Sequence, residues 1–351
     1  MTSIRAVAER AGVSSATVSR ALNGSGYVSE AVRRTVEQAS ADLGYRPNVH
    51  AQRLRGKRSN MIGLVFNDAM NPFFGELAFA VEDIARQRGF SVIVGNTRWE
   101  FAAHLRYLET FGSYGVDGLM IVPAQMTKRQ RTALTALTVP YVLLDQRIPS
   151  LPVDQVATDS VEGARRMVDH LVGIGHRRIA LIGGNPQMPT ARDRLRGYRE
   201  SLAAHDIACD DALVRMRDFS TESGYLLTQA LLRETVPDAL FAVNLNTLVG
   251  AVRAVREAGL AIPHDIAVTG FDDVPFMAAI DPFLTVVTQQ NRALGVVAAQ
   301  LLLDKIEGKR ATTDHQTILL QAELIVRESC GAAMRSDGAG GAVGAGGACA
   351  A

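Results

Sequence analysis

The residues with the clearest chemical potential lie at the amino end, where basic side chains are concentrated. Residues 1–60 contain ten Lys or Arg and four Asp or Glu, a net charge of +6, whereas the rest of the chain carries −5. A basic segment on a mildly acidic body indicates a polyanionic partner for that segment alone. Nucleic acid is one interpretation of this asymmetry. A solvated basic surface without a partner is the other.

Catalytic and metal-binding motifs are absent from the sequence. It contains no GxSxG, HExxH, P-loop GxxxxGK(S/T) or strand-linked GxGxxG pattern, and Gly183-Gly184 lacks the rest of a dinucleotide fingerprint. The seven histidines are scattered, and His170 and His176 are not expected to share a helix face. We therefore expect no enzyme, no metal site and no cofactor.

The cysteines and the apolar segments indicate the cellular compartment in which the protein is expected to act. The three cysteines are an odd number without CxxC spacing, which argues against a disulfide framework and a zinc site. No run of 18 apolar residues predicts a transmembrane helix, and the first 25 residues lack the apolar core of a secretory signal. These features favour a cytoplasmic protein.

Three short helices are predicted in residues 1–46. Apolar spacing indicates helices over 4–10, 15–22 and 29–43, with Ser14 and Ser29 as caps and Gly12 and Gly44 as breakers. Two short helices joined by a tight turn are typical of a helix-turn-helix. Residues 47–60 then form a basic linker or a second nucleic-acid element.

From residue 61 the pattern changes to strands alternating with amphipathic helices. Alternation of this kind predicts parallel sheets covered by helices on both faces. Its extent favours two doubly wound lobes, with lobe 1 over about 61–158 plus 290–320 and lobe 2 over about 160–288 plus 321–330. Residues 331–351 are mostly Gly and Ala, and we expect this tail to be disordered. The predicted strands are 61–66, 90–94, 118–122, 141–144, 179–182, 239–243, 266–269 and 284–287. The predicted helices are 74–88, 161–174, 194–204, 224–232, 247–258 and 294–306.

Six motifs, in order along the chain, carry a resemblance to the lac repressor family. The first, at 4–24, is IRAVAERAGVSSATVSRALNG. The others are LGYRPN at 43–48, NPFF at 71–74, VDGL at 116–119, GHRRIA at 175–180 and GFDD at 270–273. The similarity extends from residue 2 to about 328.

The resemblance implies a fold and an assembly. The fold is a helix-turn-helix headpiece over 1–46, a hinge helix and linker over 47–60, and a two-lobed core over 61–330 like that of the periplasmic sugar-binding proteins. The implied assembly is a homodimer on palindromic double-stranded operator DNA, with a small effector between the lobes. The tail has no leucine heptads, so a tetramerising coiled coil is not expected.

The resemblance also assigns residues to DNA. A helix that enters the major groove needs short hydrogen-bonding residues at its amino end. Ser15 and Ala16 occupy base-reading positions, and Arg20 also faces bases. Leu54 falls where the family inserts a leucine into the minor groove, which kinks the duplex. The neighbouring Arg55 would neutralise phosphate. The positions that hold the backbone or the groove edge are Ser14, Thr17, Ser19, Asn23 and Tyr27.

The same resemblance assigns an effector site at nine positions. Amide, carboxylate and guanidinium groups bond to hydroxyls, and aromatic faces cover the C–H patches of a sugar. The set is most similar to that of the ribose-type repressors. It consists of Asn71, Phe73, Phe74, Asp145, Arg194, Phe219, Asn244, Asp272 and Gln289.

Two departures from the ribose-type pattern bear on the ligand. Gln146 stands between Asp145 and Arg147, so the charge of Arg147 is displaced by one residue, and Leu245 replaces a common aspartate. The expected function is a repressor of a carbohydrate-utilisation operon, released from DNA by a monosaccharide or a derivative. The alternatives are a co-repressor-dependent regulator and one that responds to a sugar phosphate or a nucleobase. The additional positive charge of Arg192 and Arg196 near Arg194 is compatible with a phosphorylated ligand.

Overall fold

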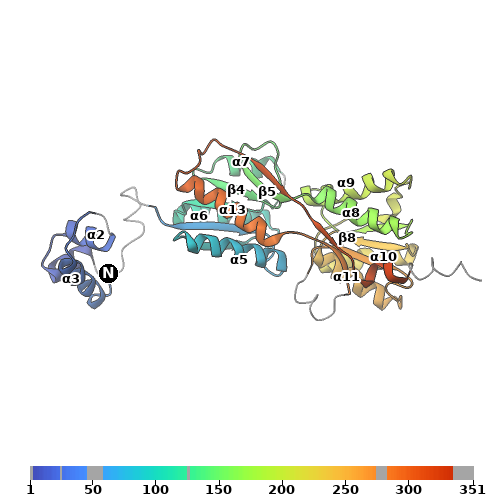
Figure 1. The fold of residues 1–351 in the computed structure, drawn as a ribbon, viewed down its shortest axis with the longest axis horizontal. Helices are drawn as coiled ribbons and strands as arrows, with labels where there is room; N and C mark the ends of the chain where they lie inside the picture. The colour runs from blue at the N-terminus through green and yellow to red at the C-terminus, as the bar shows by residue number, and fades with distance from the viewer. Residues whose placement is uncertain (1–2, 24–25, 46–57, 125–126, 274–282, 335–351) are drawn as a thin grey trace, which may run out of the picture. The chain divides into compact units, whose positions relative to one another are not determined.

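The amino-terminal residues fold into three helices that bury a small apolar core. The computed structural model describes residues 3–23, 26–45, 58–124, 127–273 and 283–334. The chain divides into two compact units, Met1–Ser59 and Asn60–Ala351, and the three helices belong to the first. The helices are α1 (Ile4–Ala11), α2 (Ser15–Asn23) and α3 (Glu30–Asp42). Val7, Val18 and Val36, one from each helix, are fully buried together. Figure 1 shows this three-helix unit.

Capping residues explain where these helices begin and end. The Ser29 hydroxyl accepts a hydrogen bond from the Val32 N–H at 3.5 Å. Gly12 and Gly44 take left-handed backbone conformations with φ 64° and 58°, which glycine adopts without a steric penalty. The hinge expected over 47–60 lies outside the described residues except for its last three.

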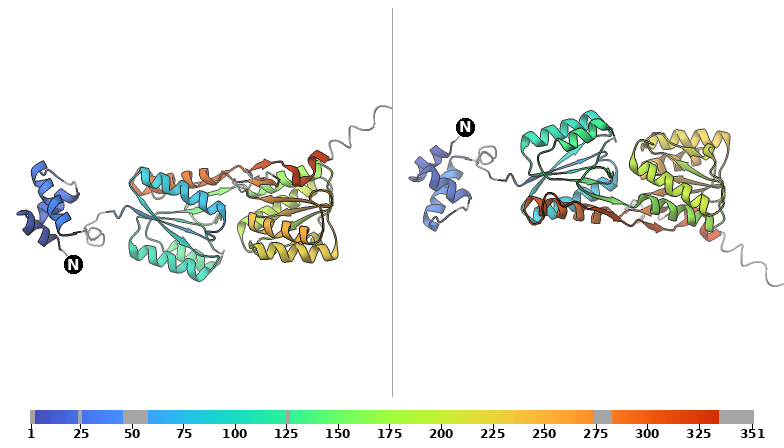
Figure 2. Two further views of the ribbon diagram at one scale, coloured as in Figure 1. Left: turned by 90° about the horizontal axis from the view of Figure 1, so that it is seen from below. Right: turned by 90° about the horizontal axis from the view of Figure 1, so that it is seen from above.

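The first lobe of the second unit is built on a parallel six-stranded sheet. Its strand order is β11-β5-β4-β3-β1-β2. Helices cover both faces of this sheet (Figures 1 and 2). The strands are β1 (Met61–Phe66), β2 (Ser91–Asn96), β3 (Gly118–Ile121), β4 (Tyr141–Leu144), β5 (Asp154–Thr158) and β11 (Thr317–Leu320). The helices are α5 (Pro72–Gln87), α6 (Phe101–Tyr114), α7 (Lys128–Thr135) and α13 (Asn291–Ile306).

The second lobe repeats this plan with one antiparallel edge. Its strand order is β12-β10-β9-β8-β6-β7, and only the β10–β12 pair is antiparallel. The strands are β6 (Ile179–Ile182), β7 (Val214–Arg215), β8 (Ala239–Ala242), β9 (Ala267–Phe271), β10 (Thr285–Thr288) and β12 (Glu323–Ile325). The helices are α8 (Ser160–Gly173), α9 (Pro189–Ala204), α10 (Thr221–Glu234), α11 (Leu245–Glu257) and the short η1 (Asp211–Leu213) and η2 (Glu328–Cys330). The expected fold class, two doubly wound lobes with a helical headpiece, is confirmed.

Several elements escape the sequence pattern. Helices α6 and α7 and strands β5, β7, β11 and β12 were not predicted. Strand β5 begins Asp-Gln, but both side chains are buried because Asp154 pairs with Lys305 at 2.6 Å and Gln155 bonds the backbone of Ile148. The partners of Asp154 lie about 150 residues away, so no local period reveals the strand.

Two expected boundaries are wrong. Helix α9 begins at Pro189 rather than at residue 194, because proline is well suited to a first helical turn. The expected disordered tail starts too early, since Gly331 ends η2 and Ala332 packs against the core of the second lobe. Residues 335–351 lie outside the described part. Within that part, no helix is both long enough and apolar enough to cross a membrane.

Candidate functional site

The amino end of α2 presents short polar residues and one arginine. The Ser14 hydroxyl caps the helix by accepting from the Thr17 N–H at 3.1 Å and is 2.9 Å from the Thr17 hydroxyl. Ala16 and Arg20 are exposed one helical turn apart, and the Arg20 Nε donates to the Ala16 carbonyl at 3.4 Å. Ser15 and Ser19 are half-buried. Short polar side chains and one arginine are residue types that can bond to base edges, and the assignment of this surface to DNA stays a prediction.

Other residues expected at DNA differ in how far the structure describes them. Tyr27 is 92% exposed, so it has no packing role within the headpiece. The backbone of Asn23 ends α2, while its side chain lies outside the described part. Leu54 and Arg55 lie outside the described residues altogether. Their assignment to DNA stays a prediction.

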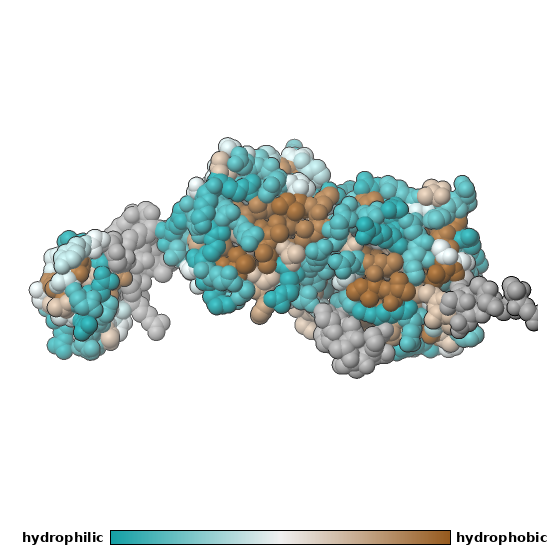
Figure 3. Space-filling model, in the orientation of Figure 1, coloured by the Kyte–Doolittle hydropathy of each residue, from teal (hydrophilic) through white to brown (hydrophobic). Residues whose placement is uncertain are grey.

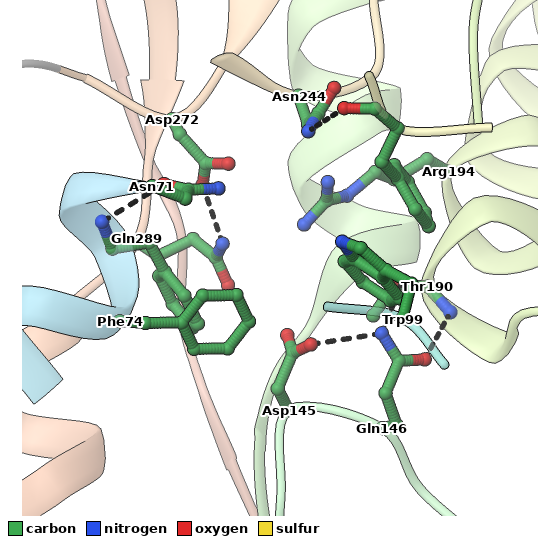
Figure 4. A pocket seen from close by; sticks show the side chains of 12 residues that line it. Asn71, Phe74, Trp99, Asp145, Gln146, Thr190, Arg194, Asn244, Asp272 and Gln289 are labelled. Atoms are coloured by element: carbon green, nitrogen blue, oxygen red, sulfur yellow. Dashed lines mark hydrogen bonds between the residues drawn. The ribbon is translucent and has the colours of Figure 1, made fainter. Parts of the chain in front are cut away.

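The nine residues expected at an effector converge on one pocket between the lobes of the second unit (Figure 4). They come from loops and helix ends at the carboxyl edges of both sheets, where open α/β sheets bind ligands. Three further residues, Trp99, Gln146 and Thr190, complete the lining. All twelve are buried except Trp99, which is half-buried.

Helix starts position two of the lining amides. Asn71 caps α5, and its Oδ1 accepts from the Phe73 N–H at 3.0 Å, so its amide NH₂ group remains to bind a ligand. Asn244 forms a capping box with Thr247 at the start of α11, and its Nδ2 donates to the Phe219 carbonyl at 3.2 Å. Asn244 therefore shapes the pocket wall more than it offers free hydrogen-bonding groups.

Three charged side chains are buried in the pocket. Arg194 lies 3.7 Å from the centre of the Phe271 ring and donates to the Val243 carbonyl. Asp272 accepts from the Gln289 Nε2 at 2.5 Å, and Asp145 accepts from the Gln146 Nε2 at 2.9 Å. Two carboxylates and one guanidinium leave the cluster with one net negative charge when all are ionised.

The pocket retains unused hydrogen-bonding capacity. Among the described residues, the buried Arg194 Nε and Gln289 Oε1 have no hydrogen-bond partner. A buried polar atom without a partner costs free energy, and a bound hydroxyl can satisfy a donor and an acceptor at once. The two aspartates are also held in left-handed backbone conformations, with φ 61° at Asp145 and 76° at Asp272. Strained backbone is common at ligand sites.

Burial shifts the ionisation of both aspartates. It raises the pKa of Asp145 to about 6, an effect that the positive charge of Arg194 only partly offsets and the nearby Asp272 reinforces. Burial likewise raises the pKa of Asp272 despite the guanidinium beside it. Burial lowers the pKa of Arg194, while both aspartates oppose this change.

We expect Asp145→Asn to stabilise the protein in a pH-dependent way. Folding raises the pKa of Asp145 from 3.8 to about 6, so the folded state binds more protons between these pH values. Wild-type stability contributed by this group therefore falls as the pH rises through about 6. The variant should match the wild type near pH 3.8 and exceed it by about 3 kcal/mol above pH 7. Urea denaturation at pH 4.5 and 7.5 measures the difference, and a gain that is equal at both pH values would contradict it.

Aromatic faces reach the pocket from both lobes. Trp99, in the loop between β2 and α6, stacks on Phe219, which precedes α10, with ring centroids 5.2 Å apart and planes at 29°. Phe73 and Phe74 meet edge to face at 4.9 Å. Such aromatic faces can pack against the C–H patches of a sugar ring.

Polar contacts connect the lobes beside the pocket. Gln146 Nε2 donates to the Thr190 hydroxyl at 2.8 Å, and Arg147 pairs with Asp193 at 2.8 Å. The displaced arginine of the sequence thus does not line the pocket but bridges the lobes. Arg192 and Arg196 are exposed, outside the pocket lining, and Arg196 pairs with Glu200 at 3.6 Å.

Sequence reasoning missed the remaining three lining residues. Gln146 was treated only as the residue that displaces Arg147. Thr190 lies in the part of α9 that the sequence pattern did not predict. Trp99 is the single tryptophan of the chain, which is the one signal that could have drawn attention to it.

Each of the two units matches the model of a known protein family. Residues 3–48 match the model of bacterial regulatory proteins of the lacI family, and residues 168–330 match a periplasmic binding protein-like domain. A ribose operon repressor of Halalkalibacterium halodurans is 37% identical over 94% of this chain and 97% of its own length.

Two solved structures are similar over most of the chain. A lac repressor dimer bound to operator and the anti-inducer ONPF has a TM-score of 0.81 and 33% identity, covering 94% of this chain and 99% of its own. A complex of the regulator CelR with cellobiose has a TM-score of 0.72 and 32% identity, covering 94% and 100%. With its helix-turn-helix headpiece and its two-lobed core, the chain belongs to the LacI family of bacterial regulatory proteins.

Proposed function

We propose that this protein is a transcriptional repressor of a carbohydrate-utilisation operon, and that an uncharged, sugar-like ligand releases it from a palindromic operator. The observation that carries the ligand class is the interlobe pocket, where buried Asp145, Arg194 and Asp272 meet aromatic faces from both lobes. The protein performs no catalysis in this proposal and acts in the cytoplasm, where its DNA is.

The charge of the pocket favours an uncharged ligand over a sugar phosphate. The buried cluster holds two carboxyl groups and one guanidinium, and the three other arginines of α9, Arg192, Arg196 and Arg199, are exposed. A phosphate group would add about −1.5 to −2 of charge to a site that already has a negative excess, at a cost that burial increases. Hydroxyl groups bond to the same residues without that cost.

A second copy of the chain is the expected protein partner. The second unit exposes large apolar side chains on both lobes, among them Phe79, Val94 and Val249, and Figure 3 shows apolar areas on the face that it presents. Exposed apolar surface of this kind is typical of an interface. The structural relative bound to operator is a dimer. A dimer would also bring two hinge segments together, so that two Leu54 side chains reach one minor groove.

The position of the pocket explains how a bound ligand would release the protein from DNA. Its residues come from both lobes, so a ligand favours one arrangement of the lobes over others. Lobe 1 begins with β1 at Met61, directly after the hinge and linker segment of residues 47–60. A change in how the first lobes of two protomers meet would separate the hinges, with a coupling of about 1–3 kcal/mol between ligand and operator.

A mobility-shift assay tests the proposed function. The operator is first selected from a random duplex pool by the full chain, and its affinity is then measured with and without a panel of neutral sugars and sugar phosphates. A selected palindrome released by a neutral sugar supports the proposal. A ligand that tightens operator binding, or a phosphorylated sugar as the only effector, would contradict it.

Arg20→Ala should reduce discrimination between operator and random DNA. The exposed guanidinium lies on the same face of α2 as Ala16, and a bidentate contact with a base is worth about 1–3 kcal/mol of specificity. Lys57→Ala is the matched control. Lys57 belongs to the basic segment 47–60 and is expected, like Arg55, to neutralise phosphate, so its loss should weaken binding to all sequences alike. Competition binding with both duplexes gives the ratio, and an equal loss on both for Arg20→Ala would rule out base reading.

A further inference from the structure

A second and larger cavity adjoins the effector pocket; we call it the outer cavity and the effector pocket the inner pocket. Its volume is about 510 Å³, compared with about 30 Å³ for the inner pocket. Trp99 and Phe219 line both cavities, so their stacked rings form the partition between them. The outer volume falls within the range of about 300–1,000 Å³ that is usual for ligand sites, and the inner volume does not.

The backbone that carries the partition is strained. Arg98 and Trp99 both adopt left-handed conformations, with φ 53° and 61°, although neither is a glycine. Each such residue lowers the free energy of unfolding by about 1 kcal/mol or more, and such residues cluster at functional sites. The indole of Trp99, carried by this segment, lines both cavities and stacks on Phe219.

Two amides in the outer cavity are held ready to donate. Asn96 Oδ1 accepts from the Arg98 N–H at 3.4 Å, and Asn185 Oδ1 accepts from the Gln187 N–H at 2.9 Å. Each bond uses the carbonyl end of the side chain and leaves the NH₂ end, for which the described residues record no acceptor. One amide belongs to each lobe, and both line the cavity.

The charges of the outer cavity match those of the inner pocket. Asp68, Asp218 and Arg98 are its charged lining residues, so the lining again has one negative charge in excess. Hydrogen bonds from Ser220 help to lower the pKa of Asp218, which keeps it an acceptor at neutral pH. Aromatic surface, oriented amides and acidic acceptors are the groups that bind an uncharged, hydroxyl-rich ring.

We propose that the outer cavity is a second ring-binding subsite, and that the ligand is an uncharged saccharide of at least two rings. One ring packs against Trp99 in the outer cavity and bonds to Asn96 and Asn185. The other ring lies beside Arg194, where the inner pocket of about 30 Å³ has to widen, by a change in the arrangement of the lobes, to admit it. This inference rests on the proposed function, because it extends the same sugar site.

Calorimetric titration of the full chain tests the second subsite. The probes are D-glucose, D-galactose and D-xylose, and the disaccharides cellobiose, maltose, lactose and xylobiose. At least one disaccharide should bind about tenfold more tightly than its own monosaccharide units, in line with one aromatic stacking contact. Trp99→Ala should remove that advantage, and Trp99→Phe should restore most of it.

Two further variants separate binding from folding. Asn185→Asp keeps the bond from the Gln187 N–H but removes the NH₂ donor, so it should also reduce the disaccharide advantage. Tyr114→Ala, at the exposed end of α6 in the same lobe as Trp99, should leave the advantage unchanged. Thermal midpoints of all variants show whether each one is folded.

The outcomes distinguish the two proposals. A monosaccharide that binds as tightly as every disaccharide containing it would overturn the second subsite and leave the proposed function standing. A disaccharide advantage that survives in both Trp99→Ala and Asn185→Asp would also overturn it. Failure of every probe to bind would overturn the subsite together with the sugar-responsive function.

Discussion

A chain that begins at Asn60 is expected to lose specific operator binding while it keeps its fold and its ligand. The division falls between the two compact units, Met1–Ser59 and Asn60–Ala351, and each buries an apolar core of its own. All of the excess positive charge lies before residue 60, and the remaining chain carries −5. Phosphate neutralisation supplies most of the affinity of such proteins for DNA.

The expected loss is at least about 1,000-fold in operator affinity, which is the low end of the usual gap between specific and non-specific binding. A mobility-shift assay with the selected operator measures it. Calorimetric titration of the shortened chain with the identified sugar is the control, and its dissociation constant should equal that of the full chain. Specific DNA binding that persists without residues 1–59 would show that the second unit also contacts DNA.

Arg194→Ala is expected to abolish the response to ligand and to leave operator binding nearly intact. The Arg194 residue is 3% exposed, its guanidinium interacts electrostatically with two buried aspartates, and its Nε has no hydrogen-bond partner among the described residues. Loss of a charged donor of this kind weakens ligand binding by about 1.5–3 kcal/mol for each hydrogen bond. Because α2 and its DNA-facing residues belong to the other unit, the variant should repress without being induced.

The same substitution should destabilise the second unit. Removal of one partner from a buried charge cluster leaves Asp145 and Asp272 uncompensated, at a cost of about 3–5 kcal/mol. The cost should shrink as the pH falls below about 6, where Asp145 takes up a proton. Urea denaturation at pH 5 and 7.5 checks this dependence.

Arg196→Ala is the matched control for Arg194→Ala. It removes the same side chain from the same helix, but its side chain is 58% exposed and pairs only with Glu200 among the described residues. Ligand should release Arg196→Ala from the operator as it releases the wild type, and the free energy of unfolding of this variant should be unchanged. If Arg194→Ala responded to ligand as the wild type does, the assignment of the pocket as the effector site would be wrong.

Local pattern was enough to predict the fold class, and the family resemblance assigned the position of the pocket. The three headpiece helices follow from apolar spacing and from caps such as Ser29, because these are interactions between residues three or four apart. Asn71, Asp145, Asn244 and Asp272 each follow a strand that the sequence reveals. Parallel strands place their carboxyl ends at one edge, so residues far apart in sequence are expected to meet there.

Tertiary contacts alone decided the remaining features. Strand β5 is buried because Asp154 finds Lys305, and a pattern of five residues contains no information about a partner in another helix. Trp99 lines the pocket because two successive residues adopt positive φ, a conformation that no side chain type at 98 or 99 announces. Arg147 bridges the lobes instead of lining the pocket because Asp193 lies opposite it. The sequence by itself determined the family, the fold class and most of its elements, and the resemblance to the family identified nine side chains that meet in the pocket. The partition of the cleft by Trp99 and Phe219 was decided only by the packing of one lobe against the other.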